Sequence, residues 1–347
     1  MNLNKIKLSI IGVGRMGITH YSIINTHPNV QIISVADTSK VTLSILRKYI
    51  KTLKVYTDFK ELIDLSKPEA IIVCTPPNLH YQIIKYAFER GIHVFCEKPF
   101  TANKLQAEEL ADLFYSSNII NQVGYANRFS DVFNKAKTLI QSRVIGDVIR
   151  YKSEMFSCAI VKKTNGDSWR DKKENGGGAV YEMASHLIDL NNYIFGPADS
   201  VGGTVLNNVF SANVEDIVST TLLYKNGLSG TLYVNWSDES YRKPMIIIEI
   251  FGTKGKIIAD FYGYKIYLTE ENKSLNLRKG WSVNTLPKVN NPVPFYVRGN
   301  EFTRQLYYFA DLVSQKEIKS ICTFNDALKT HIIIDKMFID SEKNLQF

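Results

Sequence analysis

The stretch Gly12-Val13-Gly14-Arg15-Met16-Gly17 decides the fold of the first part of this chain. It follows an apolar run at residues 7–11 and precedes a helical pattern at about 16–26. A second apolar run, at residues 30–36, ends at Asp37, twenty residues after the last glycine of the stretch. A strand, a glycine-rich turn, a helix, a second strand and an acid at this distance are typical of a dinucleotide-binding site, whereas an isolated glycine pattern also suits an ordinary structural turn.

The residues of this turn have separate expected roles. Gly12 permits the tight turn, Gly14 lets the backbone approach the pyrophosphate, and Gly17 lets the helix pack close to the strand. The helix that begins beside Arg15 and Met16 offers unpaired N–H groups and a positive dipole end to the phosphates. We therefore expect all five residues to bind the cofactor.

Asp37 is expected to choose between the two nicotinamide cofactors. Its carboxylate is placed to accept hydrogen bonds from the ribose diol of adenosine, and its charge would repel a 2′-phosphate. This favours NAD. Lys40 lies close by in the sequence and could meet a 2′-phosphate, so NADP stays an alternative.

Length and composition limit the class of protein. A chain of 347 residues is expected to form about two domains, and 45% hydrophobic with 22% charged residues is ordinary for a soluble globular protein. No apolar run approaches a membrane span, and the start runs directly into the first strand without room for a signal peptide. The four cysteines lack metal-ligand spacing, and Cys74 and Cys96 are expected as buried reduced thiols. We therefore expect a cytoplasmic protein without a metal or a membrane partner.

The net charge of +8 has two interpretations. The basic residues are spread along the chain, except for a cluster at Lys162-Lys163 and residues 170–173, and no nucleic-acid motif accompanies them. We therefore expect no nucleic-acid partner. A solvated basic surface and a site for an anionic substrate both remain open.

The hydrophobic pattern divides the chain into two different parts. Residues 1–126 alternate apolar runs with amphipathic helical stretches, which predicts a doubly wound α/β domain with a parallel sheet; its strands are expected at 7–11, 30–36, 70–74, 92–96 and 119–124. Residues 127–347 predict an α+β domain with a largely antiparallel, open sheet; strands are expected at 148–158, 201–206, 217–224, 228–236, 244–251 and 255–260, and helices at about 131–143, 178–195, 298–315 and 325–342.

Polar residues follow three of the parallel strands, where ligands of such sheets bind. Thr75, Pro76, Asn78 and His80 follow one strand, Glu97 and Lys98 the next, and Asn127 and Arg128 the last, which makes them candidate cofactor- or substrate-binding residues. A charged pair at the end of a buried strand is costly unless it is used or paired. Pro99 could hold a cis bond that aims the Lys98 ammonium group, while a surface Glu–Lys pair is the simpler alternative.

A second cluster follows three glycines at 176–178. Glu182, His186 and Asp189 have i, i+4 and i+7 spacing, which places all three on one helix face. Such a histidine can act as a general acid or base near neutral pH. A core histidine satisfied by Asp189 is the alternative, and a metal site is the least favoured because another ligand type is missing nearby.

These motifs occur in an order that resembles the Gfo/Idh/MocA family of glucose–fructose oxidoreductases, inositol dehydrogenases and rhizopine catabolism proteins. The resemblance covers nearly the whole chain, and Glu97-Lys98-Pro99 is its most diagnostic part. It implies a Rossmann domain followed by an open-sheet domain that packs against another subunit in dimers or tetramers. It also implies NAD(P)-dependent oxidation or reduction of a sugar, cyclitol or sugar nucleotide.

The resemblance assigns roles to individual residues. Lys98 would contact the reacting hydroxyl and the nicotinamide ribose, and His186 would exchange the substrate proton. Glu182 stands where the family often has aspartate. The Trp169-Arg170 pair would reach toward the nicotinamide or the substrate, and Tyr181, Arg128 and Asp189 are further candidates for substrate binding.

Two other functions compete with net hydride transfer. The chain could retain NAD and use transient oxidation for elimination or glycoside cleavage, as some members of the family do. It could also be a non-catalytic NAD-binding sensor or scaffold, although such a protein would have no chemical need for both Lys98 and His186.

Overall fold

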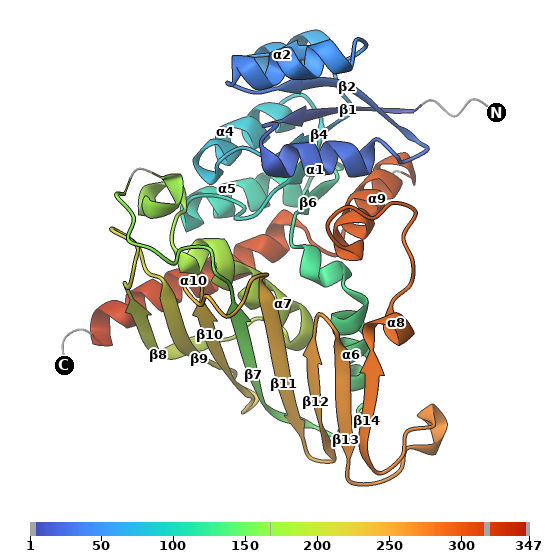
Figure 1. Cartoon of the computed structure of the whole chain (residues 1–347), viewed down its shortest axis with the longest axis vertical. Helices are drawn as coiled ribbons and strands as arrows, with labels where there is room; N and C mark the ends of the chain where they lie inside the picture. The colour runs from blue at the N-terminus through green and yellow to red at the C-terminus, as the bar shows by residue number, and fades with distance from the viewer. Residues whose placement is uncertain (1–4, 167, 316–319, 345–347) are drawn as a thin grey trace. The chain divides into compact units, whose positions relative to one another are not determined.

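The computed structural model describes residues 5–166, 168–315 and 320–344 (Figure 1). Its internal contacts group the chain into two units. The first combines Met1–Ala126 with Pro292–Leu328, and the second combines Asn127–Asn291 with Lys329–Phe347. The segment that contains the late helix α9 (Asn300–Gln315) therefore belongs by contact to the first unit, although it follows most of the second unit along the chain.

The first unit is built on a six-stranded parallel sheet with the order β3-β2-β1-β4-β5-β6. Its strands are β1 (Ile6–Ile11), β2 (Val30–Ala36), β3 (Lys54–Tyr56), β4 (Ala70–Val73), β5 (His93–Cys96) and β6 (Asn121–Val123). The direction of winding reverses between β1 and β4, which pair with each other in parallel. All four residues of β4 are buried, as expected for a strand covered on both faces. The predicted doubly wound α/β fold is confirmed.

Five helices connect these strands: α1 (Arg15–Ile24), α2 (Lys40–Tyr49), α3 (Phe59–Ser66), α4 (Pro77–Phe88) and α5 (Lys104–Tyr115). The side chains of Ser39, Asp58 and Asn103 cap α2, α3 and α5 by accepting backbone N–H groups. Gly14 occupies the same position at α1 and has no side chain to offer. The first turn of α1 is therefore left for another acceptor.

The helix α9 completes the core of the first unit. Leu306 and Phe309 are fully buried among residues of β1, β2 and α1, and Phe309 packs edge-on against Phe95 of β5, with 5.8 Å between ring centroids. The hydrophobic cover on this side of the sheet thus comes from two distant parts of the sequence.

The second unit contains an eight-stranded sheet with the order β14-β13-β12-β11-β7-β10-β9-β8 (Figure 1). Only β7 and β10 pair in parallel, so the predicted, mostly antiparallel sheet is confirmed. Its strands are β7 (Val148–Phe156), β8 (Ser200–Asn207), β9 (Ile217–Leu223), β10 (Ser229–Asn235), β11 (Met245–Gly252), β12 (Gly255–Asp260), β13 (Gly263–Leu268) and β14 (Gly280–Thr285).

One face of this sheet carries the hydrophobic core of the second unit. Every second residue of β9, β10 and β11 is buried, and these side chains pack against α6 (Asp131–Gln141), α7 (Ser185–Phe195) and the later part of α10 (Phe324–Asn344). The alternating residues of the opposite face stay partly exposed. A sheet with one covered face and one open face matches the period-2 pattern of its strands.

Several elements differ from the expected ones. The sequence pattern missed β3, β13, β14 and the short α8 (Leu286–Val289), because three-residue strands and strands of mixed polarity give weak periodic signals. The predicted helix at 178–195 begins instead with a π-helical segment, Val180–Ala184, followed by α7. Within the described ranges, no helix has the length and apolar character that a membrane crossing requires.

Candidate active site

The glycine turn after β1 is shaped by close backbone contacts. Gly12 has a φ of +89°, and a Cβ on it would lie 2.7 Å from the carbonyl of Cys74 at the end of β4. A Cβ on Gly17 would lie 1.9 Å from the carbonyl oxygen of Gly12. By contrast, nothing lies within 4 Å of a Cβ built on Gly14. Gly12 and Gly17 thus allow the turn to pack closely. Gly14 leaves open space beside the uncapped first turn of α1, which begins with Arg15 and Met16.

Asp37 joins the glycine turn to the start of α2. Its Oδ2 accepts the backbone N–H of Val13 at 2.7 Å, and its Oδ1 accepts that of Ser39 at 2.8 Å. Each carboxylate oxygen has a further lone pair, and the side chain is only half-buried, so it can still accept hydroxyl groups. The open turn, the uncapped helix and this acid fit a dinucleotide. Gly12, Gly14, Arg15, Met16, Gly17 and Asp37 would hold it.

The segment after β4 places two predicted residues at the start of α4. Pro76 and Asn78 are exposed there, and Pro76 caps the helix without a side-chain hydrogen bond. The hydroxyl oxygen of Thr75 is buried and has no hydrogen-bond partner among the described atoms. These three residues can therefore still contact a bound molecule.

The side chain of His80 in α4 is buried and contacts backbone carbonyl oxygens of two segments. It is fully buried, with Nε2 2.8 Å from the carbonyl oxygen of Thr75 and Nδ1 3.1 Å from those of Pro99 and Phe100. Burial lowers the pKa of His80, although these carbonyl contacts and Glu97 oppose the effect. Its ring thus ties the end of β4 to the loop after β5, and a contact of His80 with the cofactor stays a prediction.

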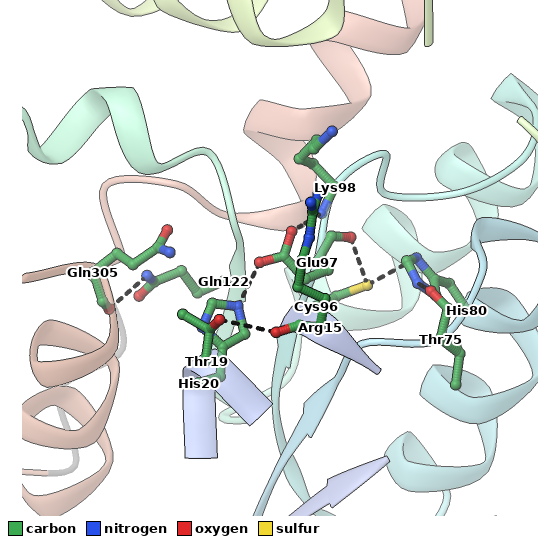
Figure 2. A network of polar contacts seen from close by, with 10 residues as sticks. All are labelled: Arg15, Thr19, His20, Thr75, His80, Cys96, Glu97, Lys98, Gln122 and Gln305. Carbon is green, nitrogen blue, oxygen red and sulfur yellow. Dashed lines mark hydrogen bonds and ion pairs between the residues drawn. The ribbon is translucent and has the colours of Figure 1, made fainter. Parts of the chain in front are cut away.

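Glu97 and Lys98 lie at the carboxyl end of β5 (Figure 2). Glu97 is buried, and its Oε2 accepts the backbone N–H of Lys98 at 3.2 Å. The Lys98–Pro99 bond is cis, and Lys98 is half-buried. Because Glu97 is buried and Lys98 is half-buried, the two residues do not form the exposed surface pair that was the simpler alternative.

Two residues of the first unit near Glu97 had no predicted role. His20 of α1 places its Nε2 2.5 Å from Oε1 of Glu97. Burial and the charge of Arg15 lower the pKa of Arg298, whereas Glu97 and Glu301 raise it, so the Arg298 guanidinium lies within electrostatic reach of both the turn and Glu97. No sequence motif singles out Arg298, because it enters the first unit from a segment distant in the chain.

In the second unit, Arg128 and Asp189 satisfy each other. Arg128 donates from Nε at 2.8 Å and from Nη2 at 2.7 Å to the two carboxylate oxygens of Asp189, and the side chains are 4% and 1% exposed. Arg128 lies in the 3-10 helix Ala126–Phe129, where the neighbouring Asn127 is also buried. This bidentate pair engages the charges that were expected to bind substrate, and a role of Arg128 and Asp189 in substrate binding stays a prediction.

His186 and Glu182 remain accessible. Both are half-buried, and Oε1 of Glu182 lies 3.6 Å from Nη2 of Arg170. Arg170 also covers the ring of Trp169 at 4.6 Å, so these predicted residues form one group around Glu182. The π-helical segment holds Glu182 in a wider turn than an α-helix, which changes the i, i+4, i+7 alignment assumed from the sequence. His186 and Glu182 are accessible, whereas Asp189 is not.

The glycines before this helix make room for a buried acid. A Cβ on Gly178, where φ is +94°, would lie 2.3 Å from Oε1 of Glu215, and that oxygen accepts the N–H of Val180 at 2.8 Å. Burial raises the pKa of Glu215. Tyr181 packs beside Phe338, at 5.9 Å between ring centroids, and burial, with Asp335 and Glu215, raises its pKa to about 12. Tyr181 therefore faces α10 within the core.

The structure thus gathers two groups of candidate residues, one in each unit. The first unit holds the open glycine turn, Asp37, Thr75 and Lys98, and the second holds His186, Glu182 and Arg170. Among the described residues, no cluster of three or more histidine, cysteine, aspartate or glutamate side chains could hold a metal ion.

Two family models match this chain. One, described as "Oxidoreductase family, NAD-binding Rossmann fold", matches residues 6–125, and the other, the GFO/IDH/MocA C-terminal domain, matches residues 133–258. The chain belongs to the Gfo/Idh/MocA family. The first description names an oxidoreductase family with an NAD-binding Rossmann fold, and the first unit of this chain has that fold.

Curated relatives of this family cover different shares of the chain. An uncharacterized oxidoreductase of Schizosaccharomyces pombe is 35% identical over 56% of this chain and 53% of its own length, so the chain matches about half of that relative. The scyllo-inositol 2-dehydrogenase (NAD(+)) of Bacillus subtilis is 25% identical over 89% of this chain and 86% of its own. The myo-inositol 2-dehydrogenase of Thermotoga maritima is 26% identical over 73% and 75%.

A solved structure supports the fold along the whole chain. A levoglucosan dehydrogenase in complex with NADH and levoglucosan aligns with a TM-score of 0.87 and 21% identity, and the alignment covers 98% of both chains. At this identity the likeness shows a shared fold.

Proposed function

We propose that this protein is an NAD-dependent dehydrogenase that transfers a hydride between nicotinamide and a secondary hydroxyl or ketone of a sugar or cyclitol. The observation that carries the proposal is the position of Lys98. Its backbone is held by the buried Glu97 at the carboxyl end of β5, on the same edge of the sheet as the open glycine turn. Ligands of open parallel sheets bind beyond this edge.

Lys98 would stabilise the developing charge on the substrate, and His186 would exchange the substrate proton. NAD, when bound, accepts or returns the hydride. The Lys98 ammonium group would donate a hydrogen bond to the reacting oxygen and stabilise its developing negative charge. The imidazole of His186 would take the hydroxyl proton in oxidation and return it in reduction, because histidine changes its charge near neutral pH. Glu182 and Arg170 would orient the substrate beside His186.

A neutral polyol is the proposed substrate class. The inositol and levoglucosan dehydrogenases among the relatives are named for such compounds. Arg170 of the basic cluster pairs with the carboxylate of Glu182, which offsets its positive charge toward an anionic substrate. A sugar nucleotide is the competing substrate, and Lys162 and Lys163 are exposed enough to meet its phosphates.

The proposal is tested by a substrate screen with a matched inactive variant. Sugars, cyclitols and sugar nucleotides are offered with NAD or NADP, and NAD(P)H absorbance is followed. Replacing Lys98 by methionine removes the ammonium group and keeps most of the side-chain length. We expect turnover to fall by roughly a hundredfold to a thousandfold, the usual loss when one charge-stabilising donor is removed. NADH affinity, measured by fluorescence titration, is expected to stay within about twofold, since the phosphates contact the turn instead.

Two outcomes contradict this function. If Lys98→Met keeps most of its turnover, Lys98 is not the charge-stabilising group. If product forms without net change in NADH absorbance, the protein is a lyase or glycosidase that oxidises its substrate only transiently.

We also propose that the open face of the eight-stranded sheet binds a second copy of this chain. Aromatic side chains gather on it: Phe156 stacks on Tyr241 at 4.6 Å and lies 5.8 Å from Tyr233. Trp281 and Val283 add exposed apolar surface on β14, at 55% and 56% exposure. A large sheet face with such residues is typical of an interface.

A charge placed on this face is expected to weaken the assembly. Sedimentation velocity on the unmodified protein should give a dimer or tetramer, and Tyr233→Glu should shift it toward monomer. Tyr115→Glu is the control, because Tyr115 is 81% exposed on the other unit. A monomeric unmodified protein, or equal assembly of Tyr233→Glu, would contradict the proposed interface.

A further inference from the structure

We infer that His20 is a positioning residue for the reaction: it holds the carboxylate of Glu97 and, through it, the backbone of Lys98. This inference rests on the proposed function, because it assigns His20 a task in placing the reacting lysine. His20 belongs to no motif that the family resemblance used, and its side chain is fully buried, so it cannot touch the substrate itself.

The imidazole of His20 contacts two residues. Its Nε2 lies 2.5 Å from Oε1 of Glu97 (Figure 2). An ionised carboxylate can only accept a hydrogen bond, so Nε2 carries the hydrogen and donates it. The ring also packs edge-on against Phe95 of β5, with 5.5 Å between centroids and an interplanar angle of 79°. The histidine can therefore hold Glu97 in one orientation.

Glu97 is enclosed by three segments of the sheet edge. Its Oε1 contacts His20 of α1, and its Oε2 accepts the N–H of Lys98 at 3.2 Å. A Cβ on Gly124, just after β6, would lie 3.0, 3.2 and 3.3 Å from Oε1, Cδ and Oε2 of Glu97. A side chain at this position would press on the carboxyl group, which would have to give by a few tenths of an ångström. The carboxylate thus lies closely packed between α1 and the two strands β5 and β6.

The charges around Glu97 keep it ionised in this enclosure. Burial raises the pKa of the Glu97 carboxyl, but the hydrogen bond and charge of His20, followed by those of Lys98, outweigh burial and leave the pKa below its ordinary value. Arg298, His80, Cys74 and Cys96 also sense its charge, and burial followed by Glu97 raises the pKa of both thiols. Removal of His20 would take away the hydrogen bond and the charge that most lower this pKa, so the pKa of Glu97 would rise.

This arrangement links the cofactor turn to the reacting lysine through one helix. The first turn of α1 adjoins the glycine stretch, and His20 lies on the same helix, five residues after Arg15. A helix is rigid over this distance, so the helix that would meet the phosphates also contacts Glu97. The Nδ1 atom of His20 is buried without a hydrogen-bond partner among the described residues. The polar contact that the structure shows for this ring is therefore the one between Nε2 and Glu97.

The test compares two substitutions of similar size in the full-length protein. His20→Gln places an amide donor where Nε2 was, whereas His20→Asn is shorter and reaches only to the position of Nδ1. We expect His20→Asn to lower kcat by about tenfold to a hundredfold, because small misplacements of a reacting group have effects of this order. KM for the sugar and NADH affinity should change little. The acid limb of the pH profile should move toward neutral pH, as the pKa of Glu97 rises. His20→Gln should recover most of kcat.

A third variant reaches the same carboxylate from the other side. Gly124→Ala should displace Glu97 without touching His20 and should reproduce the loss of kcat. A purely structural role would instead lower the melting temperature equally in His20→Asn and His20→Gln and leave the pH profile unmoved. Equal kcat in the unmodified protein, His20→Asn and Gly124→Ala would overturn the inference.

A measurement independent of activity separates this inference from the proposed function. The titration of the Glu97 carboxyl, followed by carbon-13 NMR with labelled glutamate, should shift upward in His20→Asn and less in His20→Gln. If the unmodified protein turns over no substrate, the proposed function has failed, and this titration alone decides whether His20 holds Glu97. An unchanged Glu97 titration in His20→Asn would overturn the inference whether or not the protein is active.

Discussion

Replacing Gly17 by alanine is expected to destabilise the first unit and to weaken NADH binding. The new Cβ would lie 1.9 Å from the carbonyl oxygen of Gly12 and 2.9 Å from its carbonyl carbon. These are backbone atoms of a turn that cannot move away as a flexible side chain could. Overpacking of this kind lowers the free energy of unfolding by about 1–3 kcal/mol or more. Because α1 must shift to relieve the clash, its uncapped N–H groups would lose their aim at the phosphates, and NADH affinity should fall by at least about tenfold.

Gly14→Ala is the matched control for this prediction. A Cβ on Gly14 would have nothing within 4 Å, and the φ of −67° with ψ of −167° at this position suits any residue. Stability, measured by urea unfolding, should therefore hold in Gly14→Ala while NADH affinity falls, since the added methyl occupies the space proposed for the pyrophosphate. Equal unfolding midpoints for Gly17→Ala and the unmodified protein would contradict the packing argument.

Asp189→Asn is expected to lower the free energy of unfolding of the second unit by about 3–5 kcal/mol. The substitution keeps the shape of the side chain but removes the charge that Arg128 meets at 2.7 and 2.8 Å. Both side chains are almost wholly excluded from water, at 4% and 1% exposure. Removing one partner of a buried ion pair costs this much because the remaining charge stays desolvated. Urea unfolding followed by tryptophan fluorescence measures the change.

Asp147→Asn provides the comparison on the same unit. Its partner Arg143 is 72% exposed and Asp147 is 68% exposed, so water screens the pair and the loss should stay below about 1 kcal/mol. A second comparison uses the sugar KM. If Asp189→Asn raised KM while unfolding at the urea concentration of the unmodified protein, the original assignment of Asp189 to substrate binding would be right.

The Rossmann unit could be predicted from sequence because its signals are local and redundant. The glycines at 12, 14 and 17, the apolar runs and Asp37 each point to the same strand–turn–helix arrangement. The strand β3 was missed because it lacks such local signals. A strand of three residues is too short to show a period, and its place at the edge of the sheet depends on pairing with β2.

The contacts at the site that the sequence did not reveal involve partners that are distant in sequence. His80 follows a strand end as a ligand would, yet its carbonyl partners at Pro99 and Phe100 come from the next loop. Asp189 lies one helical turn from His186, but its charge is taken by Arg128, sixty-one residues earlier. For His20, the sequence indicated no role at the site at all. On sequence alone it is one polar residue in an amphipathic helix, and only the fold brings it to Glu97.

The return of α9 to the first unit also governs when this protein can fold during its synthesis. Leu306, Phe309 and Ala310 complete the cover of the parallel sheet, and they leave the ribosome roughly 180 residues after β6. At an elongation rate of about 5–20 residues per second, α9 is synthesised on the order of 10–40 s after the sheet that it covers. Throughout this interval the nascent Rossmann sheet presents apolar surface from β1 and β5. The cell must keep that surface from aggregating until the last part of the chain emerges.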